Sequence, residues 1–147
     1  MRSTCLFCGI AQGSTPAFEV FRNDRLVAFL DTGPIRDGHV QIIPHDHYTT
    51  FDDLPAGLAS EIMHLAQKLA RAQKKLYGVD RVGFVFTGGD IPHAHAHLVP
   101  LVANTDITSR RYIAEAELTW RAMPTPTDEA MAGTADALAA MLAELEG

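Results

Sequence analysis

The 147-residue sequence is poor in cysteine, with only Cys5 and Cys8, which stand in one short run. In a reducing compartment this spacing indicates metal or redox chemistry more than a structural disulfide. Basic residues are also scarce: 12 Lys and Arg face 18 Asp and Glu, which gives a net charge of -6. This balance argues against a nucleic-acid polymer as the partner, because such proteins usually carry a basic stripe. It does not exclude a small nucleotide, because backbone N–H groups and a few local cations can bind the phosphates.

Long apolar runs are absent as well. No stretch approaches the roughly 20 apolar residues that cross a bilayer, so we expect no membrane partner. The segment 1–5 lacks the long apolar core of a secretory signal, and a cytoplasmic protein is therefore expected. The length suits one compact domain over residues 1–147, because a chain of this size buries roughly 68–70% of its unfolded surface.

The hydrophobic pattern changes its period along the chain. Alternation of apolar and polar residues predicts short strands at 18–21, 26–31, 38–44, 81–87 and 92–102. Leucines at helical spacing predict a long helix over 58–76, with Asp52 or Asp53 capping its start and Gly78 at its end. The break at 124–127 offers a cap for a final helix over 131–145. Strands interrupted by a long helix indicate an α+β fold with an antiparallel sheet.

The segment 92–100 contains three histidines, His93, His95 and His97, in strict alternation with apolar residues. On a strand they would share one face, with neighbours about 6–7 Å apart. The pattern could be a half-polar strand or a trio of metal ligands. A row of neutral imidazoles would instead offer nucleophile, acceptor and donor near pH 7. Strict alternation of three favours a functional row. The Cys5–Cys8 pair, taken alone, fits zinc, a redox dithiol or two incidental thiols.

The run 92–100 resembles the signature of the histidine triad (HIT) family. Two further segments, 29–34 and 38–47, resemble the family's segment after its second strand and its "G-H-apolar-P-x-x-H" strand. The resemblance covers residues 5–102, a motif-bearing core, and leaves 103–147 as a C-terminal tail and helix. It implies a HIT-like antiparallel sheet of about five strands with one long helix and a C-terminal helix.

The resemblance also implies a nucleotide hydrolase or nucleotidyl transferase that attacks the α-phosphate of a mono- or dinucleotide conjugate. The bonds that such an enzyme cleaves would be phosphorus anhydride or phosphoramidate bonds. His95 would be the nucleophile, through a nucleotidyl-histidine intermediate. His97 would hydrogen-bond the phosphate or the leaving group, and His39 would orient the row. Family members generally dimerise, so a homodimer is expected.

The resemblance to the family also implies which residues contact the substrate. Asp31 would accept hydrogen bonds from the ribose hydroxyls, and the base would lie between Phe7, Ile10 and Phe29. Taken alone, Ile10 and Phe29 would be core residues and Asp31 a turn former. The backbone at Gly88 and Gly89 would approach the phosphate, because glycine permits close contact.

A subgroup of the family holds a structural zinc, which needs four ligands. His47 and His93 would complete the set that Cys5 and Cys8 begin. His93 would then serve the metal and leave His95 and His97 for chemistry. We expect His45 and His64 to be solvated surface histidines.

The loop before the histidines departs from the family pattern. Thr87 replaces an Asn, Gly89 a Gln, and Asp90 a hydroxyl residue that faces the phosphates. An ionised Asp90 would repel an anionic substrate unless Arg110 or Arg111 compensates. A phosphoramidate or an unusual nucleotide conjugate is therefore the favoured substrate. The alternative is a nucleotide-binding regulatory module with little turnover.

Overall fold

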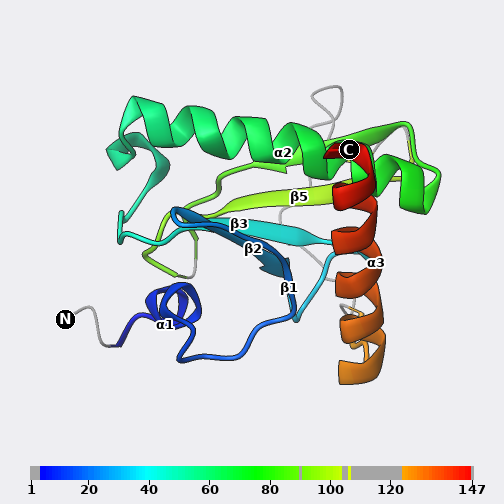
Figure 1. The fold of residues 1–147 in the computed structure, drawn as a ribbon, viewed down its shortest axis with the longest axis horizontal. Helices are drawn as coiled ribbons and strands as arrows, with labels where there is room; N and C mark the ends of the chain where they lie inside the picture. The colour runs from blue at the N-terminus through cyan, green and yellow to red at the C-terminus, as the bar shows by residue number, and fades with distance from the viewer. Residues whose placement is uncertain (1–3, 90, 104–105, 107–123, 147) are drawn as a thin grey trace, which may run out of the picture.

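A five-stranded antiparallel sheet forms the centre of the protein (Figure 1). The computed structural model describes residues 4–89, 91–103, 106 and 124–146, and all structural statements concern these residues. The spatial strand order is β1-β2-β3-β5-β4. The strands are β1 (Glu19–Arg22), β2 (Leu26–Leu30), β3 (Val40–Pro44), β4 (Arg81–Val85) and β5 (Ala96–Leu101). The expected α+β class with about five antiparallel strands is confirmed.

Two helices cover one face of the sheet. The long helix α2 (Ala56–Tyr77) and the C-terminal helix α3 (Asp128–Glu146) pack together there, above Leu26, Ala28 and Leu30 of β2. A short helix, α1 (Leu6–Gln12), lies on the opposite face against the alternate β2 residues, Val27 and Phe29. The sheet therefore has side chains buried on both faces, and the α1 side is the one that can hold a ligand.

The helix ends match the sequence in part. Gly78 ends α2 in the left-handed region, at φ 63°, as predicted, and the Thr127 hydroxyl accepts from the backbone N–H of Ala130 at the start of α3. The prediction for the start of α2 is wrong. Its N-cap is Pro55, which makes no side-chain cap, while Asp52 and Asp53 belong to a preceding 3-10 turn.

The predicted strand over 92–102 is too long. Strand β5 begins at Ala96, so His93 and His95 precede it in an irregular segment. Pro92 has no N–H to contribute to a ladder. The N–H of Ala94 donates instead to the Tyr48 carbonyl. Of the three histidines expected on one strand, only His97 therefore lies on β5.

Helix α1 was not predicted. It has only seven residues, too few for a helical period to show in the sequence. Cys5 is its N-cap, and its sulfur accepts a hydrogen bond from the Cys8 N–H at 3.4 Å. Both cysteines thus lie on one turn of a helix that packs on the sheet. Among the described residues, no helix is long and apolar enough to span a membrane.

Candidate functional site

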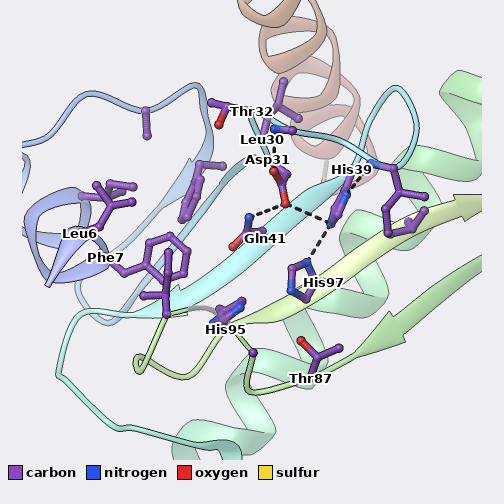
Figure 2. A pocket seen from close by; sticks show the side chains of 18 of the residues that line it. Leu6, Phe7, Leu30, Asp31, Thr32, His39, Gln41, Thr87, His95 and His97 are labelled. Atoms are coloured by element: carbon purple, nitrogen blue, oxygen red, sulfur yellow. Dashed lines mark hydrogen bonds and ion pairs between the residues drawn. The ribbon is translucent and has the colours of Figure 1, made fainter. Parts of the chain in front are cut away.

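A cavity of about 810 Å³ opens between α1 and the face of the sheet that α2 and α3 leave free (Figure 2). Segments far apart in the sequence contribute to it, from α1 to β5. It brings together most of the residues that the sequence predicted for the site, namely Phe7, Ile10, Phe29, Asp31, His39, Gly89, His95 and His97.

Gly88 is the exception among the described residues that we predicted to bind substrate. It lines a smaller neighbouring cavity of about 190 Å³, beside Thr50 and Phe51. His95 borders both cavities. Gly88 has a φ of 66°, a backbone conformation that favours glycine, so it shapes the turn after β4. The roles predicted for Asp90, Arg110 and Arg111 fall outside the described residues.

One end of the cavity is an apolar slot. The Phe7 ring meets the Phe29 ring edge-on, with centroids 5.5 Å apart, and Ile10 joins them in the same buried cluster. The Phe7 ring also lies edge-on to His95 at 5.1 Å. A flat aromatic ligand group would pack well at this apolar end of the cavity, next to His95.

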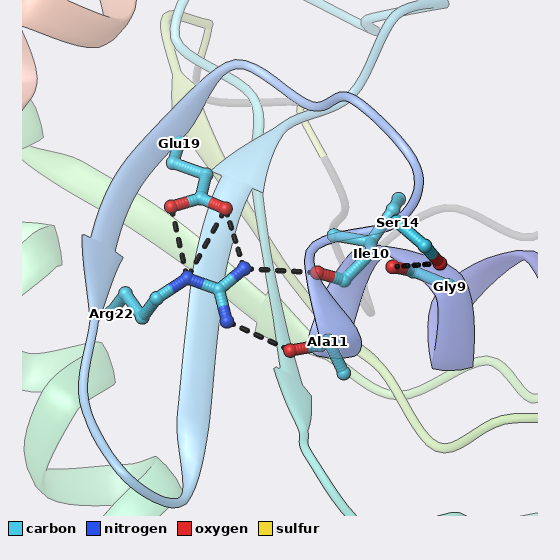
Figure 3. Close-up of polar contacts among 6 residues, drawn as sticks. All are labelled: Gly9, Ile10, Ala11, Ser14, Glu19 and Arg22. Carbon is cyan, nitrogen blue, oxygen red and sulfur yellow. Dashed lines mark hydrogen bonds and ion pairs between the residues drawn. The ribbon is translucent and has the colours of Figure 1, made fainter.

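Arg22 ties α1, which carries this slot, to the edge strand β1 (Figure 3). Its guanidinium donates to the carbonyls of Ala11 and Ile10 at 2.8 and 2.9 Å, near the C-terminus of the helix. Glu19 holds the guanidinium from the other side, with 3.1 Å between Nε and Oε2, and raises the pKa of Arg22. A cation at a helix C-terminus satisfies exposed carbonyls and interacts favourably with the helix dipole.

A chain of hydrogen bonds orders the polar end of the cavity (Figure 2). The backbone N–H of Ile35 donates to Nδ1 of His39 at 3.1 Å. Since Nδ1 accepts, the proton of neutral His39 must sit on Nε2, which lies 2.8 Å from Nδ1 of His97. His97 therefore accepts at Nδ1 and carries its own proton on Nε2.

The opposite tautomer holds at His95. Its Nδ1 lies 2.7 Å from the backbone carbonyl of His93, an atom that can only accept. Nδ1 thus carries the proton, and Nε2 keeps its lone pair. The centroids of the His95 and His97 rings are 4.9 Å apart, and both residues line the cavity.

Burial keeps two of these imidazoles neutral. It lowers the pKa of His97 to about 4, an effect to which the neighbouring His39 and His95 add. It also lowers the pKa of His39, against the opposing influence of Asp31, whose Oδ2 lies 3.7 Å from Nε2. Both imidazoles of the hydrogen-bond chain, His39 and His97, are therefore neutral at neutral pH.

Beside the cavity, Cys5, Cys8, His47 and His93 bring their ligand atoms within 4.8 Å of one another. Nδ1 of His93 lies 3.5 Å from both sulfurs, and Nδ1 of His47 lies 3.2 Å from the Cys8 sulfur. Nε2 of His93 lies 3.0 Å from the Pro44 carbonyl, which fixes its proton there and turns the Nδ1 lone pair toward the sulfurs. These four side chains could hold a metal ion.

The two other histidines differ from each other. His64 is exposed, as expected. The expectation for His45 is wrong: it is half-buried, and its Nε2 is buried without a hydrogen-bond partner among the described residues. It follows β3 and donates its backbone N–H to the Arg25 carbonyl, which draws it against the sheet.

Gln41 is a site residue that was not predicted from the sequence. Gln41 lines the cavity and donates from Nε2 to Oδ2 of Asp31 at 2.8 Å. A signal was present, since two-residue alternation puts Gln41 on the same strand face as His39.

The HIT domain model matches residues 12–104. The chain belongs to the HIT family. The adenosine 5'-monophosphoramidase HNT1 of Saccharomyces cerevisiae is 32% identical over 99 residues, which are 67% of this chain and 63% of the relative. Hydrolases of nucleotide conjugates thus occur among the chain's relatives.

Solved structures agree with the fold. A HIT family hydrolase from Legionella pneumophila has 35% sequence identity and a TM-score of 0.63, and the match covers 71% of this chain and 98% of the other. A zinc-bound histidine triad family protein from Mycobacterium smegmatis superposes with a TM-score of 0.75 at 24% identity, over 99% of this chain and 98% of the other. The HIT-like arrangement therefore extends through α3.

Proposed function

We propose that the protein hydrolyses, or transfers, a nucleoside monophosphate from a nucleotide conjugate, with His95 as the nucleophile. The observation that carries this proposal is the 2.7 Å contact between Nδ1 of His95 and the His93 carbonyl. It commits the proton to Nδ1 and leaves a lone pair on Nε2, in a residue that lines the cavity. A neutral imidazole with a directed lone pair is a competent nucleophile at pH 7.

In the first step the Nε2 lone pair of His95 forms a bond to the α-phosphorus. The bond from phosphorus to the leaving nitrogen or oxygen breaks, and the leaving atom takes its electron pair and a proton from water. The resulting nucleotidyl-imidazolium is positively charged, and the His93 carbonyl stabilises it by accepting from Nδ1–H.

In the second step a water oxygen attacks the same phosphorus and releases a proton. The N–P bond breaks, and its electrons return to Nε2 of His95. His97 directs its Nε2–H toward the phosphate through both steps, because His39 occupies its Nδ1. A preorganised donor of this kind stabilises negative charge as it develops on the phosphate oxygens.

A phosphoramidate is the substrate that we favour. The relative HNT1 is named an adenosine 5'-monophosphoramidase, and the apolar slot of Phe7, Ile10 and Phe29 suits a purine base. A phosphoramidate also needs no second nucleotide site. This accords with Gly89 in the cavity wall, where the family pattern has a Gln and this chain has no side chain to contact a longer substrate.

We infer further that the Cys5, Cys8, His47 and His93 cluster binds zinc. Around a tetrahedral zinc, sulfur and nitrogen ligands lie roughly 3.5 Å apart, given bond lengths near 2.3 and 2.1 Å. Three of the four S–N separations are 3.2–3.5 Å, which fits this geometry. A site closed by four protein ligands supports structure, by joining α1 to the segment that carries His95.

The test uses a fluorogenic adenosine phosphoramidate with the zinc-loaded protein and with His95→Ala. We expect the substitution to abolish turnover and to leave the zinc content at about one per chain. His64→Ala, on the exposed face of α2, is the control and should keep full activity. Tight nucleotide binding without turnover in the unmodified protein would contradict the hydrolase and support a regulatory module. A homodimer and a cytoplasmic location stay predictions.

A further inference from the structure

Gln41 lies in the middle of a row of side chains that crosses the sheet under the cavity. In the strand register it is opposite Phe29 on β2 and opposite His97 on β5. Phe29 belongs to the apolar slot, and His97 belongs to the histidine chain. A nucleotide with its base in the slot and its phosphate at the histidines would hold its ribose over Gln41.

The orientation of the Gln41 amide is fixed by its partner. Nε2 donates to Oδ2 of Asp31 at 2.8 Å, and an ionised carboxylate can only accept. Oε1 must therefore point the other way. Figure 2 shows this oxygen directed away from Asp31, toward the side of the cavity where Phe7 and His95 lie.

The Gln41 oxygen has an unmet hydrogen-bonding capacity. Gln41 is 7% exposed, and Oε1 has no hydrogen-bond partner among the described residues. A buried acceptor without a donor is costly, and native structures usually satisfy such atoms. Because the oxygen itself is buried, contact with a ligand requires a small side-chain adjustment of the kind that binding commonly brings.

We propose that Gln41 is a specificity-determining residue whose Oε1 accepts a hydrogen bond from a ribose hydroxyl. The pocket would thereby prefer ribonucleotides to deoxyribonucleotides. Oδ1 of Asp31 accepts from the Gly33 N–H, and Oδ2 from Gln41, yet each oxygen keeps a second lone pair. Asp31 and Gln41 together then offer two adjacent acceptors to the two hydroxyls of a ribose. The inference rests on the proposed function, because it concerns the same nucleotide site.

The test is a double-mutant cycle read by calorimetry, with AMP, 2'-deoxy-AMP and 3'-deoxy-AMP as ligands. Gln41→Met keeps the side-chain length without the acceptor, and Asp31→Ala measures how much of the preference depends on Asp31. We expect Gln41→Met to lower the preference for AMP over one of the two analogues by about 3- to 10-fold, the range of one neutral hydrogen bond. Asp31→Ala should lower the preference further, because it removes one acceptor and frees the Gln41 amide to turn. The variant with both substitutions should bind AMP and both analogues equally.

Gln73→Met is the matched control. Gln73 is also buried with an unpartnered Oε1 among the described residues, but it lies in the core, bonded to the carbonyls of Gly38 and Leu98. The Gln73→Met variant should have a lower melting temperature and an unchanged preference for AMP over its deoxy analogues. Should Asp31→Ala fail to fold, Asp31→Ser replaces it, because a hydroxyl can still accept from the Gly33 N–H.

The outcomes separate the two proposals. Equal preference for AMP in Gln41→Met and in the unmodified protein would overturn the role of Gln41, while the nucleotide site would stand. Failure of the unmodified protein to bind any of the three nucleotides would overturn the proposed function and this inference with it.

Discussion

The backbone carbonyl of His93 lies 2.7 Å from Nδ1 of His95, so one residue connects the candidate metal cluster to the proposed nucleophile. The His93 side chain turns its Nδ1 to the two cysteine sulfurs, while its carbonyl sets the tautomer of His95. Any disturbance of the cluster should therefore reach the chemistry through the backbone. A closed metal site can affect activity in this way without contacting the substrate.

The first prediction concerns Cys8→Ala. Cys8 is buried on α1 and faces both His47 and His93. Its loss should release the zinc and lower the free energy of unfolding by on the order of 4 kcal/mol, at the upper end of what single substitutions cost, where loss of a metal belongs. Turnover should fall less steeply than in His95→Ala, because the nucleophile remains. Metal analysis and urea unfolding measure the two effects. Unchanged stability of metal-free protein would contradict the structural role.

The sequence predicted the sheet and its long helix well because both follow from short-range periodicity. Alternation assigned Val40 and Ile42 to one face of β3 and Ile43 to the other, and leucine spacing located α2. Alternation failed at 92–95, where the Tyr48 carbonyl, distant in the sequence, takes the N–H that a strand would need. A seven-residue helix such as α1 leaves no such periodic signal.

The candidate site was predictable as a set of residues but not as a set of protonation states. The tautomers of His39 and His93 depend on the Ile35 N–H and the Pro44 carbonyl, which only the fold brings into contact. The same is true of Gln41, whose amide orientation depends on Asp31. Roles that rest on single hydrogen bonds therefore required the structure.

The second prediction concerns His39→Ala. It removes the donor to Nδ1 of His97, so His97 can place its proton on either nitrogen. Nε2–H would then face the phosphate only part of the time, and kcat should fall by about 10- to 100-fold with a smaller change in KM. Steady-state kinetics with the adenosine phosphoramidate provide the test. A rise in KM alone would show that His39 serves binding instead.

The third prediction is a pH dependence of stability that His97 contributes. Its pKa is about 4 in the folded protein, against an ordinary value near 6.5 in the unfolded chain. Between these values the unfolded state binds more protons, so stability falls as the pH is lowered from about 6.5 to about 4.

The variant His97→Gln isolates that contribution. Metal ligands also take up protons at low pH, but they do so equally in both proteins. Urea unfolding at several pH values should give a shallower decline in His97→Gln than in the unmodified protein. Parallel curves would mean that His97 titrates alike in the folded and unfolded states.

The last prediction tests whether the attachment of α1 governs substrate affinity. Arg22→Gln removes the charge that holds the carbonyls of Ile10 and Ala11, and so loosens the helix that carries Phe7. We expect a loss of about 1 kcal/mol in stability and a rise of roughly 3- to 10-fold in KM, with kcat nearly constant. Arg25→Gln is the matched control, because Arg25 is an exposed arginine that pairs with Glu61 on α2. Equal KM values in the two variants would show that the slot keeps its shape without Arg22, since both changes remove one arginine charge and only one of them touches α1.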